Sequence, residues 1–218
     1  IAERHGLWLH VDACVGGILA PFVRDSGYAV PAFDFAIPGV SSISADLHKS
    51  GFAARPASTV SFRTRELREF ARYTFDDWPS GVYSSLTFTG TRPGGAIAAA
   101  WAAMNFLGQE GYREIAAASM RAKQKTIDGL AAIEGVKVHG APPLYAFSWA
   151  ASGVDMGAVA GAMARRGFMC GQTTSPAGIH FMATPVHEAA ADAYAAAAAE
   201  SIAEARAGGA VGKAAAYN

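Results

Sequence analysis

Short apolar runs separated by turn residues fill the first part of the chain, and this pattern predicts strands. The run Leu7–Cys14 is mostly apolar and is followed by Gly16 and Gly17. Such a run is typical of a strand buried on both faces of a parallel sheet. Two further strands are expected at Val40–Asp46 and Ser58–Arg63.

Longer segments with helical character follow. A charged helix is expected between Arg63 and Arg72, and an Ala-rich helix from Ala96 to about Leu107, where Gly108 would stop it. The other expected helices cover Gly111–Ile133, Asp155–Arg166 and Val186–Arg206. The other expected strands are Val136–His139, Leu144–Ala150, Phe168–Cys170 and Gly178–Ala183. This order predicts a fragment of an α/β domain followed by a compact α+β domain.

Composition narrows the class of protein. The formal net charge is zero, which argues against a nucleic-acid or anionic-membrane surface, and no run of about twenty apolar residues is present. The two cysteines, Cys14 and Cys170, form no CxxC pair, so neither a disulfide framework nor a metal site is expected. A reducing, cytoplasmic location fits best. Because the sequence starts at Ile1 and not at Met, we expect the chain to be the later part of a longer protein.

An acid and a lysine follow two of the predicted strands. Asp12 ends the first strand and Lys49, in the pair His48-Lys49, comes just after the second. Reactive groups gather at the carboxyl ends of strands in α/β sheets, and pyridoxal phosphate enzymes need such a pair. Considered alone, Asp12 is more often a turn or capping acid, and Lys49 is more often a solvated loop lysine than a Schiff-base one.

A glycine-rich segment, TGTRPGG at residues 89–95, leads into the Ala-rich helix. Such a turn points backbone N–H groups and the positive end of the helix dipole at an anion. A plain helix start, with Thr91 as the cap and Pro93 in the first turn, is the alternative. The other five histidines show no metal-ligand spacing and are expected to be structural, and Trp8 and Trp101 are expected in the core.

Several motifs occur together and in a characteristic order. They are VDACVGG, SSISADLHKSGFA, WPSGVYSSLTFTGTRPGGAIAAAWAAM and, near the end, GIHFMATPVH. With them the chain resembles the sphingosine-1-phosphate lyases, in the group II decarboxylase-like branch of fold type I pyridoxal phosphate enzymes. The resemblance implies an α/β fold class. A partial, aspartate-aminotransferase-like large domain would cover residues 1–110, and a small C-terminal α+β domain residues 111–218.

The resemblance also implies roles for the residues around the lysine. Lys49 would hold pyridoxal 5'-phosphate as a Schiff base, and Asp12 would pair with the ring nitrogen. Cys14 would pack near the ring and His48 would lie beside the cofactor. Arg55 stands where the family has a lysine, and its guanidinium is the candidate for binding a substrate phosphate.

Tyr83 matches a family tyrosine that approaches the substrate, where its phenol could move protons or bind the phosphate. A packed loop aromatic is the alternative. By the resemblance, the loop with Gly90 and Thr91 would reach the cofactor phosphate of the neighbouring subunit. This implies a homodimer with shared active sites.

The activity implied is that of a carbon–carbon lyase that cleaves a phosphorylated sphingoid base to a long-chain aldehyde and phosphoethanolamine. The general base is left open among Lys49, Tyr83 and His48. The alternative is a group II amino-acid decarboxylase, which often carries Trp after the lysine, where this chain has Ser50. A second alternative is a non-catalytic truncated chain. The family's upstream residues, among them a ring-stacking histidine, are not found here, so we expect these residues alone to bind the cofactor poorly and to be inactive.

Overall fold

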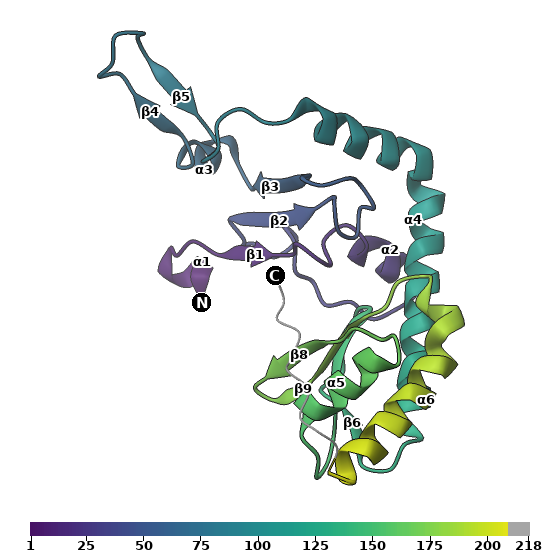
Figure 1. Ribbon diagram of the computed structural model, residues 1–218. Helices are drawn as coiled ribbons and strands as arrows, with labels where there is room; N and C mark the ends of the chain where they lie inside the picture. Colours follow the sequence, from purple (N-terminus) through teal and green to yellow (C-terminus); the bar gives the residue numbers. More distant parts are fainter. Residues whose placement is uncertain (209–218) are drawn as a thin grey trace. The chain divides into compact units, whose positions relative to one another are not determined.

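The computed structural model describes residues 1–208, which divide into two compact units. Ile1–Pro21 and Val30–Tyr112 form the first unit. Phe22–Ala29 and the residues from Arg113 onward form the second. Both units combine helices and strands (Figure 1). The division falls near the expected boundary after residue 110, and the roles assigned to the two parts stay predictions.

A three-stranded sheet lies at the centre of the first unit. Its strands, in spatial order, are β1 (His10–Asp12), β2 (Ser42–Asp46) and β3 (Ser58–Phe62). β1 and β2 are parallel, with Asp12 opposite Ser44, and β3 is antiparallel to β2. The second and third strands expected from the sequence are therefore confirmed, with small differences at their ends.

The first strand differs from its prediction in length and in burial. Only His10–Asp12 form β1, although single hydrogen bonds continue the pairing on both sides, from Ser41 N to Leu9 O and from Ala13 N to Ser44 O. The expectation of burial on both faces is wrong for this chain, since the side chains of His10 and Asp12 are exposed. β1 is also an edge strand within residues 1–208, since only β2 pairs with it there.

Helices and a hairpin complete the first unit. The short helices are α1 (Ala2–His5), α2 (Ala20–Asp25), which extends into the second unit, and α3 (Arg65–Glu69). Thr64 caps α3 by accepting a hydrogen bond from Leu67 N at 3.3 Å. The aromatic segment that follows α3 forms an antiparallel hairpin of β4 (Tyr73–Phe75) and β5 (Tyr83–Ser85) (Figure 1).

The Ala-rich helix and the helix expected after it form one interrupted element, α4 (Gly94–Ala131). Gly108 has a φ of 57° and a ψ of −171°, which lie outside the helical region, so the stop expected there is confirmed. A positive φ costs glycine little, which explains why the interruption falls at this residue. Since the helix begins at Gly94, Thr91 does not cap it, and its hydroxyl makes no hydrogen bond with any described residue.

An antiparallel four-stranded sheet organises the second unit. Its strands, in spatial order, are β6 (Val136–Val138), β7 (Ala146–Ala151), β9 (Ala177–Met182) and β8 (Gly171–Thr174). The helices α5 (Met156–Arg165) and α6 (His187–Arg206) pack against each other, and α5 also packs on β8 and β9. The fully buried Trp149 donates its indole N–H to Tyr194 at 3.1 Å, which joins the sheet to α6. An α+β arrangement is therefore present, as expected.

The strand expected at Phe168–Cys170 is wrong. Gly167 and Phe168 close the end of α5, with hydrogen bonds from Gly167 N to Ala164 O and from Phe168 N to Met163 O. Gly167 takes a φ of 89°, as the C-terminal glycine of a helix often does. The strand therefore starts three residues later, at Gly171.

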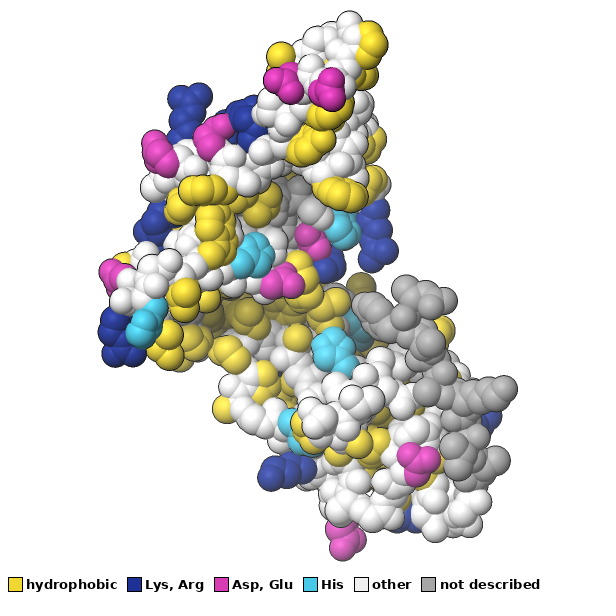
Figure 2. Space-filling model, turned by 90° about the vertical axis from the view of Figure 1, so that its left-hand side faces the viewer, with side chains coloured by type: hydrophobic (Ala, Val, Ile, Leu, Met, Phe, Trp, Pro, Cys, Tyr) yellow, Lys and Arg dark blue, Asp and Glu magenta, His cyan; other side chains and the backbone are white. Residues whose placement is uncertain are grey.

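Exposed aromatic and aliphatic side chains are frequent on the hairpin, on the loop after it and on the first segment of α4. They include Phe75, Trp78, Val82, Phe88, Ile97, Trp101 and Phe106. Figure 2 shows hydrophobic side chains at the surface at the height where Figure 1 draws the hairpin. The expectation that Trp8 and Trp101 fill the core is wrong for this chain, since they are 47% and 70% exposed. Among residues 1–208, no helix combines the length and apolarity needed to cross a bilayer.

Candidate active site

The candidate site lies at the carboxyl ends of β1 and β2. Because the two strands are parallel, Asp12 and Asp46 end at the same edge of the sheet. The backbone joins these ends directly, since Asp46 N donates to Cys14 O at 3.2 Å. This edge is where α/β sheets place their reactive groups.

Lys49 lies in a tight turn that follows β2 immediately. Its backbone N–H donates to Asp46 O at 3.1 Å, and Ala53 N returns to Leu47 O at 2.9 Å. Phe52 adopts a φ of 58°, which is uncommon for a residue with a side chain. The chain therefore reverses within a few residues and leaves the Lys49 side chain beside the sheet edge.

The ammonium group of Lys49 is paired with Asp46. The distance from Lys49 Nζ to Asp46 Oδ2 is 2.7 Å, and the two side chains are 31% and 13% exposed. The Asp46 carboxylate, and after it the Cys14 thiol, raises the pKa of Lys49 above its ordinary value. Burial alone would raise the pKa of Asp46, but hydrogen bonds from Lys49 and Ser58 outweigh burial and lower it.

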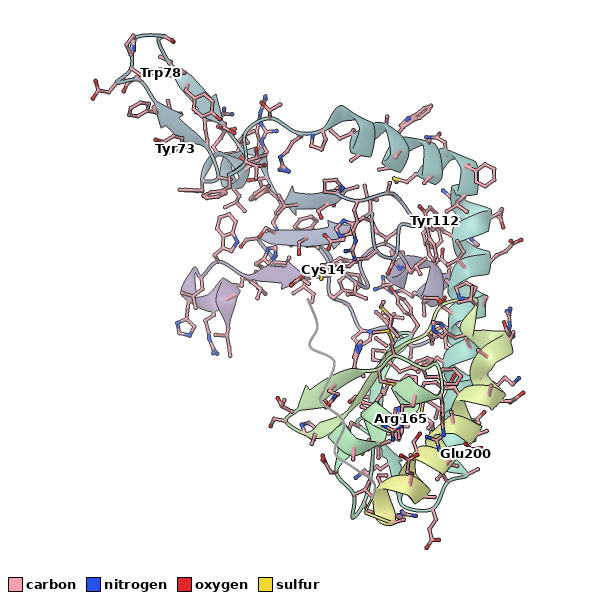
Figure 3. All side chains as sticks on the ribbon, viewed as in Figure 1. Cys14, Tyr73, Trp78, Tyr112, Arg165 and Glu200 are labelled. Carbon is pink, nitrogen blue, oxygen red and sulfur yellow. The ribbon has the colours of Figure 1, made fainter. Side chains whose placement is uncertain are left out.

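Cys14 connects the predicted cofactor acid to the predicted cofactor lysine. Its backbone N–H donates to Asp12 Oδ1 at 3.1 Å, and its thiol interacts with the side chains of both Asp12 and Lys49. Figure 3 labels Cys14 just after β1. The structure thus brings Asp12, Cys14 and Lys49 together, as the sequence predicted.

Asp12 is held as an anion. Hydrogen bonds from the backbone and the thiol of Cys14, and then from the Ser44 hydroxyl, lower the pKa of its carboxyl. The Ser44 bond measures 3.0 Å and, like the bond from Cys14 N, ends on Oδ1. A carboxylate in this state can stabilise a cationic group placed against it.

His48 approaches the same oxygen of Asp46 as the lysine does. Its Nδ1–H donates to the Ala57 carbonyl oxygen at 2.8 Å, and its Nε2 lies 3.8 Å from Asp46 Oδ2. Because a carbonyl can only accept, this bond places the proton of the neutral ring on Nδ1. Nε2 of the neutral ring is then free to accept a proton.

Two further hydrogen bonds hold the turn that contains Lys49, here called the lysine turn, to neighbouring segments. The buried hydroxyl of Ser50 donates to the Val15 carbonyl, and the phenol of Tyr112 on α4 donates to the Gly51 carbonyl at 2.8 Å. Tyr112, labelled in Figure 3, is 4% exposed. These bonds hold both the loop after β1 and the part of α4 just after Gly108 to the segment that carries Lys49.

Tyr83 and Gly90 form a second group within the first unit. The Tyr83 hydroxyl lies 2.9 Å from the position that a Cβ on Gly90 would occupy, and the ring of Tyr83 packs edge-on against Trp78. A cavity of about 410 Å³ beside this group is lined by residues of the hairpin and the loop after it, among them Tyr73 and Phe88. No hydrogen bond or ion pair within residues 1–208 joins Tyr83, Gly90 or Thr91 to Lys49, and their cofactor and substrate roles stay predictions.

Arg55 is exposed and forms no hydrogen bond or ion pair with any described residue. Its role in binding a substrate phosphate stays a prediction. The described residues also hold no group of three or more metal-ligating side chains arranged around one point.

Asp46 and Tyr112 are site residues that sequence reasoning missed. Asp46 ends the β2 pattern and stands three residues before Lys49, a spacing that one turn of chain brings into contact. That spacing was the available signal. No local signal marked Tyr112, since its partner Gly51 lies sixty-one residues earlier.

The donor set suits pyridoxal phosphate. An aldehyde needs an amine, which Lys49 supplies, and a basic ring nitrogen needs an anion, which Asp12 supplies. Their connection through Cys14 places amine and anion at one sheet edge. The residues present therefore fit two of the cofactor's three recognisable parts. The third part, the phosphate, is the group assigned by prediction to Gly90 and Thr91.

Comparisons with known proteins agree with this chemistry. The curated sphingosine-1-phosphate lyase of Oryza sativa subsp. japonica is 38% identical over 187 residues, which are 86% of this chain and 35% of that protein. A probable L-aspartate decarboxylase of Pyrococcus abyssi is 42% identical over 120 residues, 55% of this chain and 31% of that protein. The chain thus spans about a third of the length of these curated relatives.

A solved structure and a family model complete the comparison. The sphingosine-1-phosphate lyase of Burkholderia pseudomallei superposes with a TM-score of 0.88 at 35% identity, covering 94% of this chain and 47% of that one. This match confirms the predicted partial fold type I architecture. The model of the pyridoxal-dependent decarboxylase conserved domain matches residues 1–139. The chain therefore belongs to the pyridoxal-dependent decarboxylase family, and the cofactor expected from its sequence is the one for which that family is named.

Proposed function

We propose that this chain carries the lysine-bearing part of a carbon–carbon lyase that cleaves a phosphorylated sphingoid base to a long-chain aldehyde and phosphoethanolamine. The observation that carries the proposal is the contact of Cys14 with both Asp12 and Lys49 at the end of β1 and β2. The likeness to relatives named sphingosine-1-phosphate lyase supports the choice of substrate.

The residues of this chain would divide the work as follows. Lys49 would hold the cofactor aldehyde, and Asp12, kept ionised, would hold a proton on the ring nitrogen. Bound pyridoxal phosphate supplies an electron sink for the pair of electrons released when the C2–C3 bond breaks. His48 Nε2 is free in the neutral ring and could take the proton of the substrate hydroxyl, whereas Lys49 is kept protonated by Asp46. Tyr83 remains the third candidate for the base.

The test uses the complete protein with pyridoxal phosphate and a phosphorylated sphingoid base. We expect a fatty aldehyde, detected by mass spectrometry, and its disappearance in Lys49→Ala. The matched control is Lys125→Ala, because Lys125 pairs with Asp192 in the second unit and has no predicted role. No aldehyde from the unsubstituted protein would reject the lyase.

The second candidate is an amino-acid decarboxylase. The family model and the probable L-aspartate decarboxylase among the relatives favour it, because the same acid and lysine serve both reactions. Ser50 argues against it. The Ser50 side chain is buried and bonded to Val15, where the alternative class often has a tryptophan. Carbon dioxide release from a panel of amino acids, without aldehyde from the sphingoid base, would favour the decarboxylase.

A homodimer is part of the proposal. The exposed apolar side chains on the hairpin and the start of α4 support it, because patches of this kind mark interfaces between proteins. Trp101, 70% exposed, and Phe106, 90% exposed, lie on that helix segment. In sedimentation we expect Trp101→Glu to shift the protein towards monomer, with Glu110→Gln, an exposed change on the same helix, as the control. An unchanged dimer would place the interface elsewhere.

Shared active sites, with Gly90 and Thr91 reaching a partner's cofactor phosphate, belong to the same proposal. Phosphate binding by Arg55 and a cytoplasmic location are also part of the proposal.

Titrating these 218 residues with pyridoxal phosphate tests the expectation that they bind the cofactor poorly without the remaining family residues. Tight, stoichiometric binding would contradict it.

A further inference from the structure

A hydrogen-bonded network crosses from β1 to β2 behind the Asp12 carboxylate. This cross-strand network consists, in order, of Trp8, Ser42, His10, Ser44 and Asp12. Its distances are 2.9 Å from Trp8 Nε1 to Ser42 Oγ, 2.7 Å from Ser42 Oγ to His10 Nδ1, 3.3 Å from His10 Nε2 to Ser44 Oγ and 3.0 Å from Ser44 Oγ to Asp12 Oδ1. The strand register builds it, since His10 lies opposite Ser42 and Asp12 opposite Ser44.

The two ends of the cross-strand network fix the direction of every proton in it. An ionised carboxylate only accepts, so Ser44 must donate to Asp12. With its single proton used, the Ser44 oxygen must accept from His10, which places a proton on Nε2.

The hydrogen bonds at the Trp8 end of the network independently require the same tautomer of His10. An indole N–H only donates, so the Ser42 oxygen accepts from Trp8. Ser42 is 2% exposed, and its own proton needs an acceptor, since a buried unpaired donor is costly. His10 Nδ1, at 2.7 Å, is that acceptor only when it carries no proton. Both ends therefore require the neutral Nε2–H form of His10.

We propose that His10 is a positioning residue for Asp12, held as the neutral Nε2–H tautomer so that it orients the Ser44 hydroxyl towards the carboxylate. The network and the Cys14 backbone both occupy Asp12 Oδ1. Oδ2 accepts from neither the network nor the Cys14 backbone, so it is the oxygen that we assign to the N–H of a cationic ring nitrogen. The inference rests on the proposed function only in assigning that ligand, and the network itself exists without it.

The first experiment measures the tautomer directly, in the protein without cofactor. With ¹⁵N placed in histidine only, long-range proton–nitrogen correlation spectra distinguish the two ring nitrogens of each of the six histidines, and His10→Gln assigns the signal. We expect the Nε2–H form of His10 to exceed the Nδ1–H form by roughly tenfold or more at neutral pH, as one lost hydrogen bond would predict. A dominant Nδ1–H form, or a doubly protonated ring, would overturn the proposal.

The second experiment asks whether the network acts on Asp12, through the pKa of its carboxyl followed by ¹³C NMR. Ser44→Ala should raise that pKa, because it removes a donor to the charged form. His10→Phe should also raise the pKa of Asp12. His10→Gln should return that pKa to its original value, since the amide can accept from Ser42 and donate to Ser44. Ser61→Ala, an exposed serine on β3 of the same sheet, is the matched control.

An Asp12 pKa in His10→Phe equal to that in the Ser61→Ala control would overturn the positioning role of His10, whatever the value in Ser44→Ala. Absence of aldehyde in the lyase assay would reject the proposed function without altering the tautomer. The two failures are therefore distinguishable.

Discussion

The Asp46 carboxylate lies 2.7 Å from the ammonium nitrogen of Lys49 and 3.8 Å from Nε2 of His48. One acid thus faces both members of the His-Lys pair. Before a cofactor binds, Asp46 keeps Lys49 charged and therefore unreactive towards an aldehyde. A free amine is needed for that reaction, so the pairing must loosen when the lysine is used.

Asp46→Asn should lower the pKa of Lys49, because the largest contribution to its raised value is the bond to this carboxylate. Each unit of pKa changes the neutral fraction tenfold at a given pH below the pKa. Labelling of Lys49 by reductive methylation near pH 9, followed by mass spectrometry, should therefore become several-fold faster. Asp192→Asn, which frees Lys125 from its partner, should leave Lys49 unchanged. Equal labelling of Lys49 in both variants would contradict the pairing.

The same pair predicts a dependence of stability on pH. The raised pKa of Lys49 means that its contribution is complete below the ordinary value of 10.5 and is lost as pH rises through the folded-state pKa. The lowered pKa of Asp46 means that its contribution is present above 3.8 and is lost as pH falls. We expect roughly 1 kcal/mol from a partly exposed pair. Urea unfolding at several pH values checks this, and Asp46→Asn should flatten the acid-side loss that this carboxylate contributes.

Asp12→Asn should reduce turnover of the complete enzyme by at least about a hundredfold, the usual scale for loss of one preorganised electrostatic partner. The amide keeps the shape but cannot hold a proton on the ring nitrogen. Circular dichroism should show an unchanged fold. Asp25→Asn, an exposed acid at the end of α2, is the control. Near-normal turnover in Asp12→Asn would remove Asp12 from the site.

Tyr112→Phe should lower the free energy of unfolding by about 1–3 kcal/mol, because the Gly51 carbonyl loses a buried donor. Tyr73→Phe changes an exposed phenol, 60% accessible, and should cost almost nothing. Chemical denaturation of both variants makes the comparison. If the two lose equal stability, the bond from α4 does not hold the lysine turn.

Gly17→Ala should lower stability by about 1–3 kcal/mol through overpacking. A Cβ there would come within 2.8 Å of the Ala13 carbonyl and 3.0 Å of the Ala45 Cβ, so the loop after β1 could not approach β2 as closely. Gly94→Ala meets no atom within 4 Å and serves as the control. A Gly17→Ala protein as stable as the control would show that the loop can shift to accommodate the added methyl group.

Much of the local structure followed from the sequence. The apolar run before Asp46 predicted β2, and Gly108 predicted the interruption of α4, because both depend on preferences of neighbouring residues. The order of motifs predicted the family, and with it the cofactor, because the acid, the lysine and their neighbours can each be identified from the sequence.

The tertiary structure decided what those residues touch. Parallel pairing of β1 with β2 placed His10 opposite Ser42 and Asp12 opposite Ser44, so a histidine expected to be merely structural now lies behind the acid. The N–H of Phe168 makes one of the hydrogen bonds that close the end of α5, so β8 begins later in the sequence than expected. The periodicity of apolar residues indicates which segments favour a strand or a helix. It does not encode pairings between distant segments. Those pairings set the strand register, the edge position of β1 and the contact of Cys14 with both Asp12 and Lys49.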